Sequence, residues 1–306
     1  DKTLKAALAG LRENIHKGRT LSEAMEEMKG VFPNLLIYMT RTGESSGRLD
    51  ELLHKMAEYY GREEELNGKV RAAMTYPVIL FSITVMAAVF MLTMVLPRFA
   101  SMLQEQELPW ITRMMMRLSF SLCSHGFLYI MLILILMALF KGILKCPSVR
   151  LQADRAVLYT PIIGKLLRTV YTSRFASAFA VLYGSGIGIL DAMHTVGRVM
   201  GNSYVEKGLA QAAERLKGGV MLSQALEEQD LFQPVLISMV AAGEESGALD
   251  MVLEDAGSFY EKEAARAVNQ MIALLEPAMI LILALVVGSV VMAIMIPVFN
   301  MYSSML

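Results

Sequence analysis

The sequence has few of the residues from which catalytic and metal centres are built. Its 306 residues include two cysteines, four histidines and one tryptophan, and only 19% are charged. No two histidines stand at metal-ligand spacing, and no nucleophile motif or phosphate-binding loop is present. The net charge of -1 lacks the basic excess expected of a nucleic-acid-binding protein. These absences argue against an enzyme, a bound metal or cofactor, and a nucleic-acid partner.

The two cysteines, Cys123 and Cys146, flank a long apolar run. As a helix this run would separate them by about the thickness of a bilayer, too far for a disulfide. We therefore interpret both cysteines as incidental small apolar residues.

Hydrophobic residues make up 55% of the chain, which is more than an ordinary soluble domain contains. Three stretches reach the roughly twenty apolar residues needed to cross the hydrocarbon core of a bilayer. They are residues 77–97, 118–144 and 277–297, and none of them contains a carboxylate. The sequence thus predicts a membrane protein with three transmembrane helices.

One peptide occurs twice, 200 residues apart: GESSGRLD at residues 43–50 and GEESGALD at residues 243–250. The two copies align without a gap from 43–99 to 243–299, which pairs the two prolines of the first apolar stretch with those of the third. A duplication of this length indicates a repeated domain. Residues 168–201, which open the second copy, have no counterpart before Asp1, so we expect the first copy to be N-terminally incomplete.

Between the apolar stretches, hydrophobic residues recur at helical spacing, as Leu49, Leu52, Leu53, Met56 and Tyr60 illustrate. The predicted fold class is therefore all-α: a polytopic membrane protein with two repeated helical-bundle domains. The expected order is a first domain at 1–76, a membrane helix at 77–97, a short external loop at 98–117, a second membrane helix at 118–144, a second domain at 145–276, a third membrane helix at 277–297 and an external tail at 298–306. Lysine and arginine at the domain-side flanks of the spans place both domains in the cytoplasm.

Local structure explains most of the duplicated peptide. The first glycine, Gly43 or Gly243, suits a left-handed residue after a helix, and Ser46 or Gly47 can cap the helix that follows. Asp50 falls in the first turn of that helix, where a carboxylate meets unpaired N–H groups. The glycines assigned to this structural turn are Gly43, Gly47, Gly243 and Gly247.

Capping leaves the glutamates of the peptide unexplained. They could contact a basic surface of a partner, or bind a divalent cation, although one turn offers fewer than the six or more oxygens that Ca²⁺ prefers. The candidate partner-binding residues are Glu44, Asp50, Glu244, Glu245 and Asp250.

Several motifs of the second copy together resemble a known family. Arg174-Phe175, the 243–250 peptide, Phe259-Tyr260-Glu261 and Glu276-Pro277 are similar to the type II secretion system F domain, and the first copy resembles the same domain from residue 17 to residue 99. The chain thus resembles the inner-membrane platform proteins of type IV pilus and type II secretion machines.

The resemblance implies a non-enzymatic, oligomeric scaffold in the bacterial inner membrane. Its expected partners are a cytoplasmic assembly ATPase, pilin or pseudopilin subunits taken from the lipid bilayer, and other inner-membrane assembly proteins. A small-solute transporter is the alternative, since internal repeats also occur in carriers. Three spans without an intramembrane charge, and the large share of sequence outside the membrane, argue against it. A membrane-bound enzyme is a third possibility that the missing catalytic motifs disfavour.

Overall fold

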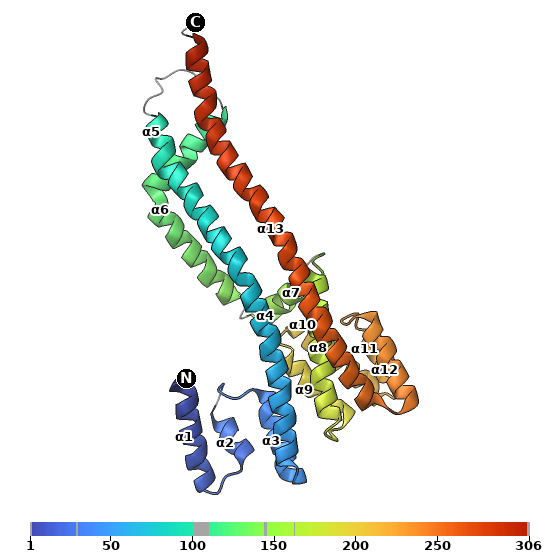
Figure 1. Ribbon diagram of the computed structural model, residues 1–306. Coiled ribbons are helices and arrows are strands. Elements are labelled where there is room, and N and C mark those ends of the chain that lie inside the picture. The colour runs from blue at the N-terminus through green and yellow to red at the C-terminus, as the bar shows by residue number, and fades with distance from the viewer. Residues whose placement is uncertain (1, 29, 101–109, 144–145, 162, 305–306) are drawn as a thin grey trace. The chain divides into compact units, whose positions relative to one another are not determined.

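A computed structural model describes residues 2–28, 30–100, 110–143, 146–161 and 163–304. Within these ranges the regular structure is helical and contains no strand, which confirms the predicted all-α class. Two compact units are present (Figure 1): unit 1 consists of Asp1–Lys69 with Arg150–Val268, and unit 2 of Val70–Val149 with Asn269–Leu306. Much of the predicted external loop, residues 101–109, lies outside the described residues.

Unit 1 begins with three short helices and the start of a long one. They are α1 (Lys2–His16), α2 (Leu21–Glu27), α3 (Asn34–Ser46) and α4 (Leu49–Phe90). Thr20 starts α2 with a capping box, in which its side chain accepts from the Glu23 N–H and the Glu23 side chain accepts from the Thr20 N–H. Leu11, Ala24 and Met25 form a small core between α1 and the helices that follow.

The second half of unit 1 begins with three helices that have no counterpart in the first half and then repeats the order of α1 to α4. Helix α7 (Pro147–Leu158) leads into α8 (Ile163–Tyr183) and α9 (Ile189–Val199). Next come α10 (Ser203–Lys217), α11 (Leu222–Glu227), α12 (Pro234–Ser246) and α13 (Leu249–Ser304). Helices α10 and α1 both have 15 residues, and α12 and α3 both have 13. The duplicated sequence thus folds into the same succession of helices in both places.

Helix α8 joins the two halves of unit 1. Its fully buried Phe175 and Phe179 belong to one core that includes Leu35 and Met39 of α3 as well as side chains of α9 to α13. The Phe175 ring also lies 4.5 Å from the ring of Phe232. Aromatic side chains of this size dominate the energy of burial, so α8 is central to the stability of both halves.

Two close contacts fix α8 between α4 and α13. On the α13 side, Gly257 approaches so closely that a Cβ there would lie 2.8 Å from the Ser177 hydroxyl. On the α4 side, Arg174 pairs with Glu63 at 3.4 Å, and both side chains are mostly shielded from solvent. The missing side chain of Gly257 permits the close contact with α13, and the ion pair between Arg174 and Glu63 orients α8 against α4.

Unit 2 contains the apolar helices. Helix α4 is followed by a π-helical turn at Met91–Val95 and by α5 (Leu96–Ala100), and α6 covers Trp110–Ile143. Among the described residues two helical stretches are long and apolar enough to cross a membrane, Leu49–Arg98 and Leu249–Ala293. Helix α6 coincides with the second predicted span, whose crossing of the membrane stays a prediction. Its Cys123 and the more distant Cys146 are free thiols.

The π-helical turn leaves backbone carbonyls that α6 satisfies. Pro97 has no N–H to donate back to the preceding turn. The Ser119 hydroxyl donates to the Leu92 carbonyl instead, and the Cys123 thiol lies 3.8 Å from the Thr93 carbonyl. Inside a membrane such groups have no water to bind, so these two side chains keep the irregular turn compatible with an apolar surrounding. Cys123 is therefore more than the incidental residue we expected.

Both long helices pass through positions that we predicted as domain boundaries. Helix α4 contains Pro77, and α13 runs from Leu249 to Ser304 without interruption. The predicted tail from residue 298 is thus helical as far as residue 304. Each helical domain ends in a helix that continues into an apolar stretch.

Candidate partner-binding site

The duplicated peptide closes one helix and opens the next in both copies. Helix α3 ends at Gly47, which has φ 70°, and α12 ends at Gly247, which has φ 69°. In each case the capping glycine N–H donates to the carbonyl of the glycine four residues earlier. These left-handed residues stop the helix, and glycine adopts that conformation at no steric cost.

Our assignment of the left-handed position to Gly43 and Gly243 is wrong. Both glycines are buried inside α3 and α12. A Cβ at Gly43 would lie 2.9 Å from the Leu49 Cα, and one at Gly243 would lie 3.1 Å from the Leu249 Cα. The first glycine is therefore needed for close packing against the returning chain, and the left-handed cap falls four residues later. Gly47 correspondingly caps the end of the preceding helix, not the start of the next.

Glu44 and Glu244 have a role that the sequence did not reveal. The Glu44 carboxylate accepts from the Leu21 N–H at 2.5 Å, the Ser22 N–H at 3.3 Å and the Ser22 hydroxyl at 2.6 Å. Each helix start has N–H groups without intrahelical partners and a partial positive charge, which a carboxylate stabilises. Glu44 belongs to α3, and its carboxylate thus caps the N-terminus of α2.

The second copy repeats this contact. Glu244 accepts from the Leu222 N–H at 2.5 Å, the Ser223 N–H at 2.9 Å and the Ser223 hydroxyl at 2.6 Å. Both glutamates are half-buried and engaged within their own copy. They are consequently poorer partner-binding candidates than we expected.

The pKa of Glu44 reflects this environment. Burial by itself would raise the pKa of the carboxyl group, but hydrogen bonds from Ser22 and the Leu21 N–H outweigh burial and lower it. The carboxylate form is therefore favoured in the folded protein.

The other candidate carboxylates remain on the surface. Asp50, Glu245 and Asp250 are exposed, with Asp50 and Asp250 in the first turns of α4 and α13. The structure does not gather the five candidate acids into one cluster. Among the described residues no group of three or more histidine, cysteine, aspartate or glutamate side chains is placed to hold a metal ion.

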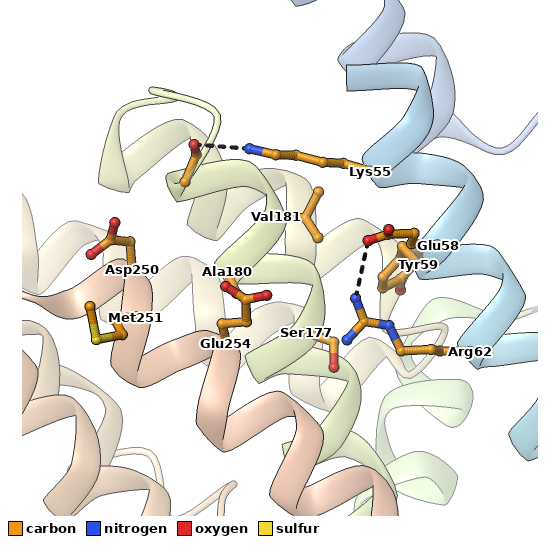
Figure 2. Close-up of a pocket in the computed structure, with 11 residues that line it drawn as sticks. Lys55, Glu58, Tyr59, Arg62, Ser177, Ala180, Val181, Asp250, Met251 and Glu254 are labelled. Carbon is orange, nitrogen blue, oxygen red and sulfur yellow. Dashed lines mark hydrogen bonds and ion pairs between the residues drawn. The ribbon is translucent and has the colours of Figure 1, made fainter. Parts of the chain in front are cut away.

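Asp250 lines a cleft in unit 1 that sequence analysis missed (Figure 2). The cavity has a volume of about 330 Å³ and lies over α8, with α4 on one side and α13 on the other. The α4 side contributes Lys55, Glu58, Tyr59 and Arg62, and the α13 side contributes Asp250, Met251 and Glu254. Helical spacing places Glu58 and Glu254 on the faces opposite the apolar stripes of their helices, but it does not indicate that those two faces border one cleft.

The two walls of the cleft differ in how their charges are compensated. Lys55 lies 3.2 Å from a Glu51 oxygen and 3.3 Å from the Gly184 carbonyl oxygen. Arg62 lies 3.8 Å from Glu58 (Figure 2). Across the described residues, the structure shows no ion pair for Asp250 or Glu254. The cleft therefore presents two carboxylates that are free to receive cationic groups.

Comparison with known proteins shows the family of the chain. A family described as Type II secretion system (T2SS), protein F matches residues 1–97 and 175–297. The type IV pilus assembly protein PilC of Thermus thermophilus is 35% identical over 100% of this chain and 76% of its own length. Type II secretion system protein F of Vibrio cholerae is 33% identical over 99% of this chain and 75% of its own. The chain belongs to the type II secretion system protein F family.

Proposed function

We propose that this chain is a non-enzymatic platform scaffold in a bacterial inner membrane, which couples a cytoplasmic assembly ATPase to the insertion of pilin-like subunits into a fibre. The names of its relatives support a role in pilus assembly or protein secretion. The two domains would lie in the cytoplasm, and the scaffold would act as an oligomer with other inner-membrane assembly proteins.

One structural observation supports the coupling most directly. Helices α4 and α13 each continue without a break from a helical domain into an apolar stretch. Pro77 and Pro277 each remove one intrahelical hydrogen bond, but the helices continue past them, so a force applied to the cytoplasmic part would be transmitted along each helix. The scaffold would thereby move pilin-like subunits inside the bilayer without hydrolysing nucleotide itself.

Weakening α13 tests this coupling. Asn269 and Gln270 are exposed in α13, where one unit gives way to the other along the chain. With both residues replaced, the helix of the double-glycine variant should be less stable by about 1 kcal/mol per residue than that of the double-alanine variant, and replacement by alanine does not weaken the helix. In cells lacking their own platform protein, the double-glycine variant should bind the assembly ATPase normally but assemble fewer fibres. The double-alanine control should assemble fibres normally. Equal fibre yields would refute force transmission through α13.

The exposed carboxylates offer a contact for the ATPase. Asp50, Glu245 and Asp250 would attract a basic surface through charges that salt screens within about 8 to 10 Å. Purified scaffold in nanodiscs should hydrolyse no ATP by itself and bind the ATPase less tightly as salt rises. Hydrolysis by the scaffold alone, or binding insensitive to salt, would contradict this mechanism.

A further inference from the structure

The cleft between α4 and α13 narrows along α8. At its wide end the cavity of about 330 Å³ is within the range of roughly 300–1,000 Å³ found for ligand pockets. Further along, a second cavity of about 30 Å³ lies among Arg62, Leu66, Arg174 and Glu261. At that end Glu261 also helps to raise the pKa of Lys69, after the larger effect of Glu65. The wide end therefore admits a few long side chains, while opposite charges approach one another at the narrow end.

Charge selects the kind of group that enters the wide end. The cations on the α4 wall already have carboxylates on their own helix, Glu51 for Lys55 and Glu58 for Arg62. Asp250 and Glu254 on the α13 wall are one helical turn apart and lie on the same face. Both are exposed and line the cavity. Within the part of the chain that the structure describes, the cations of the cleft are paired, whereas these two carboxylates are not. The unpaired charge is negative and favours cationic ligands over phosphate and other anions.

The floor and rim of the cleft fit a protein ligand. Small residues line the floor, Ser177 and Ala180 in α8 and Gly184 directly after it, and let an incoming chain approach closely. Met251 is 66% exposed beside the two carboxylates and offers an adaptable apolar contact. A bare divalent cation would find two carboxylates here, fewer than the six or more oxygens that Ca²⁺ prefers.

We propose that this cleft binds a positively charged helical segment of a partner protein, whose arginine or lysine side chains, one turn apart, pair with Asp250 and Glu254. The spacing of the two carboxylates matches cations at positions i and i+4 of a helix. The guanidinium fork of an arginine can donate hydrogen bonds to both oxygens of one carboxylate. This inference deepens the proposed function, because it locates a docking site for a partner of the scaffold.

A defined peptide tests the charge requirement. The probe is a dye-labelled, alanine-based helical peptide with two arginines one turn apart, and the control peptide has glutamates in their place. Binding to the full chain in nanodiscs is measured by fluorescence anisotropy. Asp250→Lys with Glu254→Lys should weaken binding of the arginine peptide about tenfold or more, which corresponds to about 1.4 kcal/mol. The control peptide should not bind the unaltered protein.

A matched variant separates this site from general electrostatics. Glu227 and Asp255 are exposed acidic residues that do not line the cleft. Glu227→Lys with Asp255→Lys makes the same change in net charge and should weaken binding less than about threefold. Equal losses in the two double variants, or binding of both peptides, would overturn the assignment to the cleft.

A steric variant keeps the test independent of the charge changes. Ala180→Met fills the floor without altering charge, and it should weaken the arginine peptide while circular dichroism shows the same helix content. Unchanged binding in this variant would also overturn the proposal.

The partner itself distinguishes this inference from the proposed function. If the assembly ATPase binds in nanodiscs and only the Glu227 and Asp255 variant weakens it, the cleft inference fails while the platform role stands. If the ATPase binds no form of the scaffold, the proposed coupling fails whatever the peptide result. If only the Asp250 and Glu254 variant loses binding of the ATPase, the result supports both the cleft inference and the proposed function.

Discussion

Ser223 donates a hydrogen bond of 2.6 Å to the carboxylate of Glu244, which also accepts from the N–H groups of Leu222 and Ser223. Ser22 and Glu44 make the same contact in the first copy, also at 2.6 Å. The duplicated glutamate therefore holds the start of a short helix from the end of the next one. Because α11 has only 6 residues and α2 only 7, such a cap stabilises a large fraction of each helix.

Removing the cap should destabilise the second domain. We predict that Glu244→Ala lowers the free energy of unfolding by about 1–2 kcal/mol, because the start of α11 loses its acceptor. Chemical denaturation of the detergent-solubilised chain, followed by circular dichroism, measures the change. Glu245→Ala is the matched control, since that side chain is exposed, and its effect should stay within about 0.5 kcal/mol. Equal effects of the two substitutions would disprove the capping role.

The cap in the first copy should depend on pH. Since the folded-state pKa of Glu44 is lowered, its stabilisation is complete above the unfolded-state pKa of roughly 4.3. It is lost as pH falls through the lower folded-state value. Hydrogen exchange of the Leu21 and Ser22 amides, corrected for intrinsic rates, should show protection at neutral pH that declines in this acidic range. A Glu44→Gln variant should lack this decline, and an identical pH profile would contradict the prediction.

The packing of the first glycine can be tested against another helical glycine. Gly43→Ala should destabilise the protein by about 1–3 kcal/mol, because the new Cβ would meet the Leu49 backbone at 2.9 Å. A Cβ at Gly61 in α4 would meet no described atom within 4 Å apart from its own helix backbone and chain neighbours, so Gly61→Ala should stabilise by about 0.5–1 kcal/mol. The same denaturation assay measures both. If Gly43→Ala were also stabilising, the close approach to Leu49 would be wrong.

The sequence predicted the helical class and the family because both depend on periodic or repeated signals. Apolar residues at helical spacing show in one dimension, and so does a peptide repeated after 200 residues. We assigned the left-handed residue that ends the helix to Gly43, one turn before its actual position at Gly47, because sequence spacing alone does not distinguish the two glycines. Gly43 and Gly47 look equivalent in sequence, and only the return of the chain over Leu49 shows which one packs and which one turns.

Contacts distant in sequence were not predictable in this way. Glu44 and Ser22 are 22 residues apart, and no spacing rule joins a residue in one helix to the start of another. The burial of a side chain was not predictable from its position in a helix either. Leu8 and Leu209 occupy the same place in α1 and α10, yet Leu209 is fully buried and contacts the Gly197 region of α9, while Leu8 is 54% exposed. The cleft containing Asp250 likewise depends on three helices that meet only in the fold.

Membrane topology gives the last prediction. Among the residues that the structure describes, two helical stretches are long and apolar enough to cross the bilayer. Helix α6, which is kinked at His125, overlaps the remaining predicted span. With three spans, both domains lie on one side, since a pair of crossings returns the chain to its starting side. Single cysteines at Glu58 and Glu254 should therefore resist a membrane-impermeant maleimide in intact cells, whereas one at Met114, in the predicted external loop, should react.

The labelling requires a background without the native thiols. Cys123→Ser preserves a donor for the Thr93 carbonyl, and Cys146→Ser removes the other thiol. All three probes should react after the membrane is permeabilised, which controls for accessibility within the fold. Reaction at Glu58 or Glu254 in intact cells would place that domain outside. It would also remove the cytoplasmic ATPase as its partner, because the acidic cleft and the nucleotide hydrolase would then lie on opposite sides of the membrane.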